Sequence, residues 1–241
     1  PAGLALDVDF VEAVAAGDAT ARTTLEGVVS DLGGRVAARS SAVDEDSASA
    51  SFAGQHLTVL NVTSDAGLLD AVRAVRESGF SAAASAYRER VGAGRDARVA
   101  VVVQRLVDPD VAGVLFTRNP ITAADEFVIE CAWGLGEVVV SGLVTPDHIR
   151  LKKDGALLEY RTGEKDLMLV AEGEGTREVE VEASRVHARC LGEVQLLALA
   201  SLADRCERLF GGPQDLEWAI CDGELVLLQA RAVTTRAGGG R

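Results

Sequence analysis

The sequence predicts an α+β protein in two lobes, with an antiparallel-rich sheet in the second lobe. One observation is a change of character near residue 95, where helical patterns give way to a series of strand-like runs. Another is the pair of Asp-Gly dipeptides, Asp154-Gly155 and Asp222-Gly223, which lie between strand-like runs and favour hairpin turns. We therefore expect a first lobe over residues 1–95, a second over 96–234 and a flexible, glycine-rich tail over 235–241.

Helices are expected where apolar residues recur at three- and four-residue spacing. The candidates are residues 7–16, 20–32, 65–79 and 81–91, and a long helix that opens with Ser184 as its N-cap. Strands are expected at 35–39, 58–62, 99–104, 111–117, 126–132, 148–152 and 157–161. A long polar loop, 40–55, follows the first of these strands, and long loops in compact domains tend to be functional or disordered.

Residues 214–231 have the pattern of a β-hairpin with one apolar and one polar face. The even positions are apolar: Leu216, Trp218, Ile220, Val226, Leu228 and Ala230. The odd positions include Asp215, Glu217, Gln229 and Arg231. Joining the two odd rows on one face requires an odd number of loop residues, so we expect a three-residue loop, Cys221-Asp222-Gly223. Carboxylate and amide oxygens suit a divalent cation and arginine suits phosphate, although an ordinary hairpin with a solvated salt-bridge face has the same pattern.

The composition is that of a globular protein: 48% of residues are hydrophobic and 25% charged. A net charge of −13 argues against nucleic acid as a partner. No apolar run approaches the roughly 20 residues that cross a bilayer, so we expect no membrane partner. The four cysteines show no metal or redox spacing, and we expect a reduced, cytoplasmic protein.

Several segments together resemble the family of phosphoenolpyruvate synthase, pyruvate phosphate dikinase and rifampicin phosphotransferase. They run in family order from about residue 35 to 234. The first half comprises Ala38-Arg39-Ser40-Ser41-Ala42, Ala50-Ser51-Phe52-Ala53-Gly54-Gln55, Val101-Val102-Val103-Gln104 and Ala112-Gly113-Val114-Leu115-Phe116-Thr117 with Asn119-Pro120. The second half comprises Trp133-Gly134-Leu135-Gly136-Glu137, Thr145-Pro146-Asp147, Gly163-Glu164-Lys165, Pro213-Gln214-Asp215-Leu216-Glu217-Trp218 and Gln229-Ala230-Arg231.

The resemblance implies an ATP-grasp-like fold that clamps Mg-ATP between two lobes. Carried over by position, Glu217 and Gln229 would hold Mg²⁺ with Asp215 in support. Arg231 and Arg39, the candidate catalytic residues, would contact phosphates together with Gly54 and Gln55, and Gln104 would lie beside the adenine. A direct ligand role for Glu130 or Glu137 is a further option, and Lys165 is either a phosphate contact or an exposed lysine beside a turn.

The sequence also departs from the family pattern. The glycine-rich segment with a phosphate-contacting lysine is missing, and the first lobe is short, so we expect that lobe to be incomplete. The swivelling phosphohistidine domain and the acceptor domain are missing too. Ala123 replaces a glycine that is common after Asn-Pro, and Ala232 replaces a proline.

The resemblance favours an Mg-ATP-binding module of a dikinase-type phosphotransferase. Such an enzyme passes a phosphoryl group to a histidine on a separate domain and then to a small-molecule acceptor, either pyruvate or an antibiotic-like hydroxyl. Two alternatives stay open: a non-catalytic nucleotide-binding or regulatory module, and a small kinase that acts directly on its acceptor. Whether the isolated chain is an active enzyme is therefore left open by the sequence.

Overall fold

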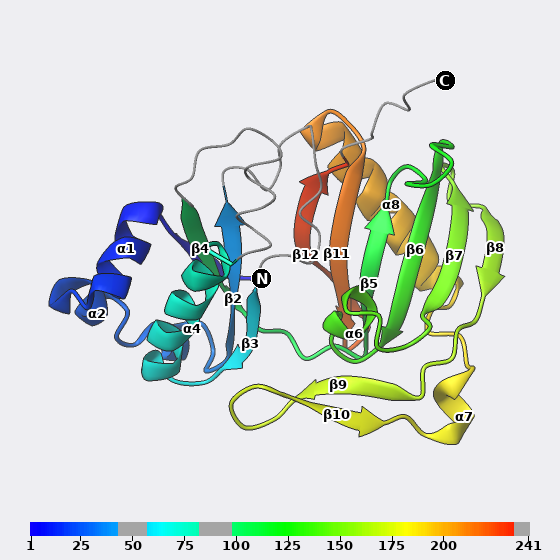
Figure 1. The fold of residues 1–241 in the computed structure, drawn as a ribbon. Helices are drawn as coiled ribbons and strands as arrows, with labels where there is room; N and C mark the ends of the chain where they lie inside the picture. The colour runs from blue at the N-terminus through cyan, green and yellow to red at the C-terminus, as the bar shows by residue number, and fades with distance from the viewer. Residues whose placement is uncertain (43–56, 82–97, 234–241) are drawn as a thin grey trace. The chain divides into compact units, whose positions relative to one another are not determined.

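A computed structural model describes residues 1–42, 57–81 and 98–233 (Figure 1). They form two compact units, each an α+β arrangement built on antiparallel strands, so the predicted fold class is confirmed at that level. Of the described residues, the first unit contains Pro1–Leu106 and Ala171–Thr176, and the second contains Val107–Val170 and residues 177–233. Among the described residues, no helix is long and apolar enough to cross a membrane.

The first unit has a four-stranded antiparallel sheet in the order β1-β4-β2-β3. Its strands are β1 (Gly3–Leu6), β2 (Val36–Ala42), β3 (Thr58–Val62) and β4 (Val99–Arg105). The sequence placed the lobe boundary near residue 95, whereas β4 pairs with both β1 and β2 and belongs to the first unit. The chain passes into the second unit only after Leu106.

Helices α1 (Val8–Ala16) and α4 (Asp65–Ser78) pack against this sheet and form its hydrophobic core. Side chains cap both helices, because Asp7 accepts from Phe10 N and Ser64 accepts from Gly67 N. The helix expected over 20–32 is instead two short ones, α2 (Ala19–Thr24) and α3 (Val28–Asp31). Gly27 separates them with a φ of +83°, which no helix interior allows.

The tip of the hairpin formed by β9 (Leu167–Ala171) and β10 (Thr176–Glu180) also belongs to the first unit. The Asn61 side chain donates to the carbonyl oxygens of Gly173 at 3.0 Å and Gly175 at 2.7 Å, and Asn61 O accepts from Gly175 N. Glu174 accepts from the Ser64 hydroxyl at the start of α4. The chain is thus tied to the first unit a second time, at a hairpin that the sequence did not predict.

The second unit contains a six-stranded antiparallel sheet in the order β12-β11-β5-β6-β7-β8 (Figure 1). Its strands are β5 (Val111–Phe116), β6 (Glu126–Trp133), β7 (Asp147–Lys152), β8 (Leu157–Arg161), β11 (Gln214–Cys221) and β12 (Glu224–Ala232). All six strands begin and end within two residues of the sequence prediction. The Asp154-Gly155 turn links β7 to β8, as expected.

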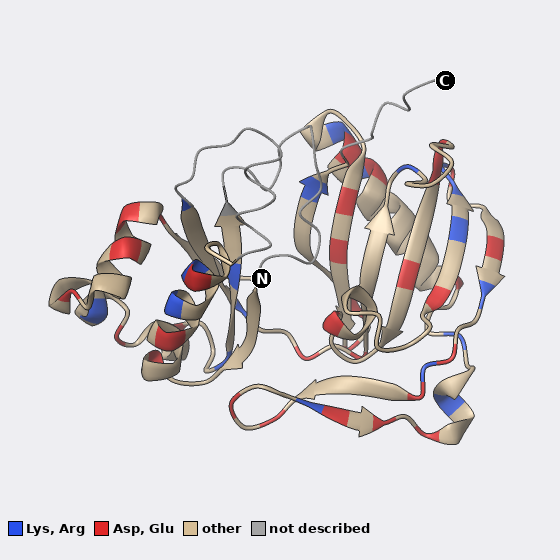
Figure 2. Ribbon diagram, in the orientation of Figure 1, with Lys and Arg blue, Asp and Glu red and all other residues tan. Residues whose placement is uncertain are grey.

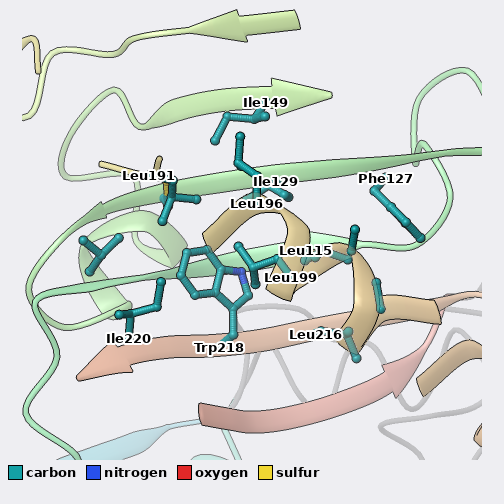
Figure 3. Packing of buried hydrophobic residues seen from close by; sticks show 14 of the residues in the cluster. Leu115, Phe127, Ile129, Ile149, Leu191, Leu196, Leu199, Leu216, Trp218 and Ile220 are labelled. Carbon is teal, nitrogen blue, oxygen red and sulfur yellow. The ribbon is translucent and has the colours of Figure 1, made fainter. Parts of the chain in front are cut away.

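One face of the six-stranded sheet packs against α8 (Glu193–Phe210) and carries the main hydrophobic core. Figure 3 shows Trp218 of β11 lying among Leu115, Leu196 and Leu199. The long helix begins later than Ser184: α7 (Ala183–Val186) is a separate turn. The backbone N–H groups of Cys190 and Leu191 donate to the Asp147 carboxylate and the Tyr160 hydroxyl, so these donors are satisfied outside a helix.

The closing hairpin pairs differently from the prediction. Its turn has two residues, Asp222 and Gly223, with φ of +51° and +80°, and Cys221 pairs with Glu224. The odd residue is in the strand instead: a β-bulge lies where Trp218 pairs with Leu227 and Glu217 pairs with Gln229, which leaves Leu228 unmatched. Consequently Leu225, Leu227 and Ala230 pack on the core, and the predicted inward positions of Val226 and Leu228 are wrong.

Replacing Trp218 with alanine should lower the free energy of unfolding by about 3–5 kcal/mol, because the indole is fully buried against α8. Chemical denaturation monitored by circular dichroism measures this. Leu197→Ala, on the exposed side of α8, is the matched control and should cost well under 1 kcal/mol. A Trp218→Ala variant as stable as the control would contradict the core assignment.

Candidate functional site

The hairpin of β11 and β12 brings the four predicted ligand residues together on one face. Asp215 pairs with Arg231, and Glu217 pairs with Gln229 in the adjacent position. Leu216 and Trp218 are fully buried on the opposite, core-facing side. Because side chains alternate across a strand, the four polar residues line the face that α8 does not cover.

Asp215 is an acid on this face with a raised pKa. Burial raises the pKa of its carboxyl to about 6, and the neighbouring Glu217 charge adds to that rise, while Arg231 opposes it. Its Oδ1 atom is buried and accepts no hydrogen bond from any residue that the structure describes. A buried carboxylate oxygen without a donor is costly, and a bound cation would remove that cost.

The polar row of Glu217 and Gln229 continues across the sheet. From Glu217 the register runs through Val114 on β5 to Glu130 on β6 and then to His148 on β7. The His148 Nδ1 atom lies 3.3 Å from Glu130 Oε1. Figure 2 shows acidic positions on β11 and β6 and basic positions on β12 and β7. Glu130 therefore shares a face with Glu217 but is two strands away, with Val114 between them.

Further along the same face, an ion-pair network fixes the start of β6. Arg150 donates to both carboxylate oxygens of Glu126, at 3.0 and 2.8 Å, and Asn119 donates to Glu126 Oε1 at 2.7 Å. The hydrogen bond from Arg150 and then that from Asn119 lower the pKa of the Glu126 carboxyl. No sequence pattern predicts this network, because it joins residues of two strands and a loop.

In the first unit, Arg39 and Gln104 lie on one face of the four-stranded sheet. Arg39 pairs with Val102 and Gln104 pairs with Ala37, whereas the alternate residues of both strands face the helices. The two predicted ligand residues are thus offset by two positions on neighbouring strands. Gly54 and Gln55 lie outside the described residues.

The hairpin's donor set fits Mg²⁺. Two carboxylates and an amide oxygen are the hard oxygen ligands that this ion prefers. Asp215, Glu217 and Gln229 would hold it, and the buried Oδ1 of Asp215 is an open acceptor among the described residues. An Mg²⁺ ion would supply charge neutralisation for phosphate oxygens at this face.

Lys165 is not exposed, which corrects one of the two sequence interpretations. Its side chain is fully buried and its Nζ lies 2.5 Å from Asp147 Oδ1, which is also fully buried. The Asp147 carboxylate accepts three more hydrogen bonds, from Gly163 N, the Tyr160 hydroxyl and Cys190 N. Lys165 therefore neutralises a core carboxylate.

Two cysteines that are distant in sequence meet beside this ion pair. The thiols of Cys131 and Cys190 and the Asp147 carboxylate lie within 4.8 Å of one another. Burial raises the pKa of Cys131 well above its usual value. All four lone-pair directions of Asp147 are already used by donors, which argues against a metal here.

Other motif residues have a structural basis. Gly134 has a φ of +74°, and a Cβ there would lie 2.5 Å from Leu169 O, while a Cβ at Gly163 would overlap Thr145 O. Ala123, where family members commonly have glycine, has a φ of +58° and so adopts a conformation that costs a non-glycine residue about 1 kcal/mol. Glu137 is the first residue of α6 (Glu137–Val140).

Asp215→Asn should stabilise the metal-free chain at neutral pH. The folded-state pKa of Asp215, about 6, lies above the 3.8 of an ordinary aspartate. The contribution of this carboxyl to the free energy of unfolding of the parent is therefore fully present below about pH 4 and is lost as pH rises through 6. At about pH 8 the free energy of unfolding of the variant should exceed that of the parent by up to about 3 kcal/mol. The difference should vanish near pH 4. Thermal melts in metal-free buffer check this, with the exposed Asp166→Asn as control. A pH-independent difference would contradict the raised pKa.

Lys165→Met should cost about 3–5 kcal/mol, because it leaves the Asp147 charge buried with no counter-ion. Adding Asp147→Asn to the same chain should recover part of this loss, since the remaining group is neutral. Urea denaturation of the single and double variants measures both. Full stability of the single variant would show that the ion pair is not structural.

With this geometry in hand, comparison with known proteins identifies a family. Residues 8–239 match the model of the family described as pyruvate phosphate dikinase, AMP/ATP-binding domain. A probable phosphoenolpyruvate synthase of Methanothermobacter thermautotrophicus is 46% identical over 202 residues, which is 83% of this chain and 30% of that protein.

Two other relatives have different names. An uncharacterized phosphotransferase, YvkC, of Bacillus subtilis is 38% identical over 202 residues, covering 83% of this chain and 24% of that protein. A rifampicin phosphotransferase of Streptomyces sviceus is 38% identical over 201 residues, covering 83% of this chain and 23% of that protein. The chain thus spans less than a third of the length of these relatives. It belongs to the family of pyruvate phosphate dikinase AMP/ATP-binding domains.

Proposed function

We propose that this chain is the Mg-ATP-binding module of a dikinase-type phosphotransferase with an ATP-grasp architecture. The observation that carries the proposal is the hairpin face, where two carboxylates, an amide and an arginine pair across adjacent positions. The unsatisfied buried oxygen of Asp215 supports a cation at that face. The family supplies ATP as the substrate.

Each residue has a distinct role in this proposal. Glu217 and Gln229 hold Mg²⁺ and Asp215 supports them, while Arg231 contacts a phosphate. In the first unit, Arg39 contacts phosphate and Gln104 contacts the adenine. Gly54 and Gln55 complete the phosphate contacts. Phosphoryl transfer needs mainly positioning and charge neutralisation, which metal and guanidinium groups supply.

The acceptor belongs to the wider enzyme. Two relatives are named for phosphoenolpyruvate synthesis and for phosphotransfer to rifampicin, and the matched residues make up only 30% and 23% of their lengths. We therefore propose a histidine on a separate domain as the first phosphoryl acceptor and a small molecule as the last. We further propose that this phosphotransferase acts in the cytoplasm.

Calorimetric titration with ATP, with and without Mg²⁺, tests the proposal. The chain should bind ATP only with Mg²⁺, and Glu217→Ala or Arg231→Ala should weaken binding about tenfold or more, because each loses a contact with a charged partner. Both residues lie on the uncovered face, so both variants should keep the parent melting temperature within a few degrees.

Glu224→Ala, at the exposed turn of the same hairpin, is the matched control and should bind like the parent. A parent chain that melts cooperatively but binds no Mg-ATP would refute the proposed function. Cooperative unfolding lost in both site variants would instead make these two residues structural.

A further inference from the structure

We propose that Arg118 is a second phosphate-binding arginine on the second unit, beside Arg231, placed to hold the phosphate of a polyphosphate chain that lies furthest from Glu217. This inference rests on the proposed function and refines the site on the second unit. Neither the family resemblance nor the motifs around it assign a role to this residue.

Arg118 lies on the polar face of the six-stranded sheet. Strand pairing continues one residue past the end of β5, because Thr117 N donates to Gln214 O at 2.8 Å and Thr117 Oγ1 accepts from Gln214 N at 2.8 Å. Thr117 is fully buried on the core side. Alternation then puts Arg118 on the opposite face, with Asp215 and Arg231.

Along that face, Arg118 lies beyond Asp215 and Arg231. Asp215 pairs with Phe116 on β5, so the continued register places Arg118 one pleat beyond the pair of Asp215 and Arg231. Two residues of strand span about 7 Å. The order from the proposed metal ligands outward is therefore Glu217, then Arg231, then Arg118. Arg231 is on β12 and Arg118 follows β5, on the other side of β11. A phosphate chain that starts at the metal and runs along β11 past Arg231 therefore leads toward Arg118.

The backbone around Arg118 is held in place by its neighbours, but its side-chain Nε atom has no acceptor among the described residues. Its neighbour Thr117 is bound to Gln214 on one side, and Asn119 is bound to Glu126 on the other. The Nε atom of Arg118 is nevertheless buried and donates to no acceptor within the described ranges. A buried N–H without an acceptor costs about 1–3 kcal/mol, which a ligand oxygen would recover.

Glu126, which the strand register places beside Arg118, is already bound by other residues. The β5–β6 register places Arg118 beside Glu126, which already accepts from Arg150 through both oxygens and from Asn119. The pKa of Glu126 is lowered by those two partners, with no part played by Arg118. The guanidinium thus keeps its charge available, and its planar fork matches the geometry of a phosphate.

The test is calorimetric binding of Mg-ATP, Mg-ADP, AMP and Mg-tripolyphosphate to the parent chain, to Arg118→Gln and to Arg118→Lys. We expect Arg118→Gln to weaken Mg-ATP and Mg-tripolyphosphate about tenfold to a hundredfold, the effect of a lost charge-assisted hydrogen bond, and to leave AMP unchanged. Arg118→Lys should fall between parent and Arg118→Gln. Arg208→Gln, an exposed arginine on α8, is the matched control and should bind like the parent.

Several outcomes separate this inference from the proposed function. Unchanged Mg-ATP affinity in a folded Arg118→Gln variant, or an equal loss for ATP and AMP, overturns the inference while the proposed function stands. A parent chain that binds Mg-tripolyphosphate through Arg118 but no nucleotide refutes the proposed function alone. A parent that binds neither ligand refutes both. Unfolding of Arg118→Gln, with Arg118→Lys folded and unaffected in binding, assigns the residue a structural role and overturns the inference.

Discussion

The register of β11 against β12 is the constraint on which the candidate site depends. Without the bulge, the pairing that begins with Cys221 and Glu224 would continue, and Gln229 would oppose Leu216 on the core side. The extra residue at Leu228 turns Gln229 and Arg231 toward the polar face, where Glu217 and Asp215 lie. A one-residue irregularity in an edge strand therefore assembles the four-residue patch, and the buried core side of the same hairpin fixes it in place.

Placing two carboxylates beside each other has a free-energy cost that the fold must offset. The cost is visible at Asp215, where burial and the Glu217 charge together raise the pKa. It is offset by the hydrophobic face beneath, because Trp218 and Leu216 are fully buried against α8. The core packing and the charged face are thus formed by opposite sides of the same strand, β11.

The sequence predicted most of what depends on local pattern and less of what depends on distant contacts. Alternation of polarity identified the face shared by Asp215, Glu217, Gln229 and Arg231, and the parity argument correctly required one odd residue. It assigned that residue to the loop, because a turn has a local signature and a bulge does not; the bulge follows from how β12 fits the core. Similarly, Lys165 is surrounded by polar residues in the sequence, and only the fold shows that Asp147 lies within reach. In the same way, the proximity of Cys131 to Cys190 depends on the fold and not on their spacing in the sequence.

The family motifs divide into two physical classes, and this division bears on function. The first class is structural: Gly134 and Gly163 allow a close approach of two backbone segments, and Asp147 and Lys165 form a buried ion pair. These residues would be kept even in a chain that binds no nucleotide. The hairpin residues are different, since burial and the neighbouring Glu217 charge raise the pKa of Asp215, and its buried Oδ1 atom accepts no hydrogen bond from the described residues, which costs stability. Retaining them at a cost to stability is expected when a ligand compensates for it. The proposal of a metal and phosphate site therefore rests on the hairpin residues more than on the motifs of the first class.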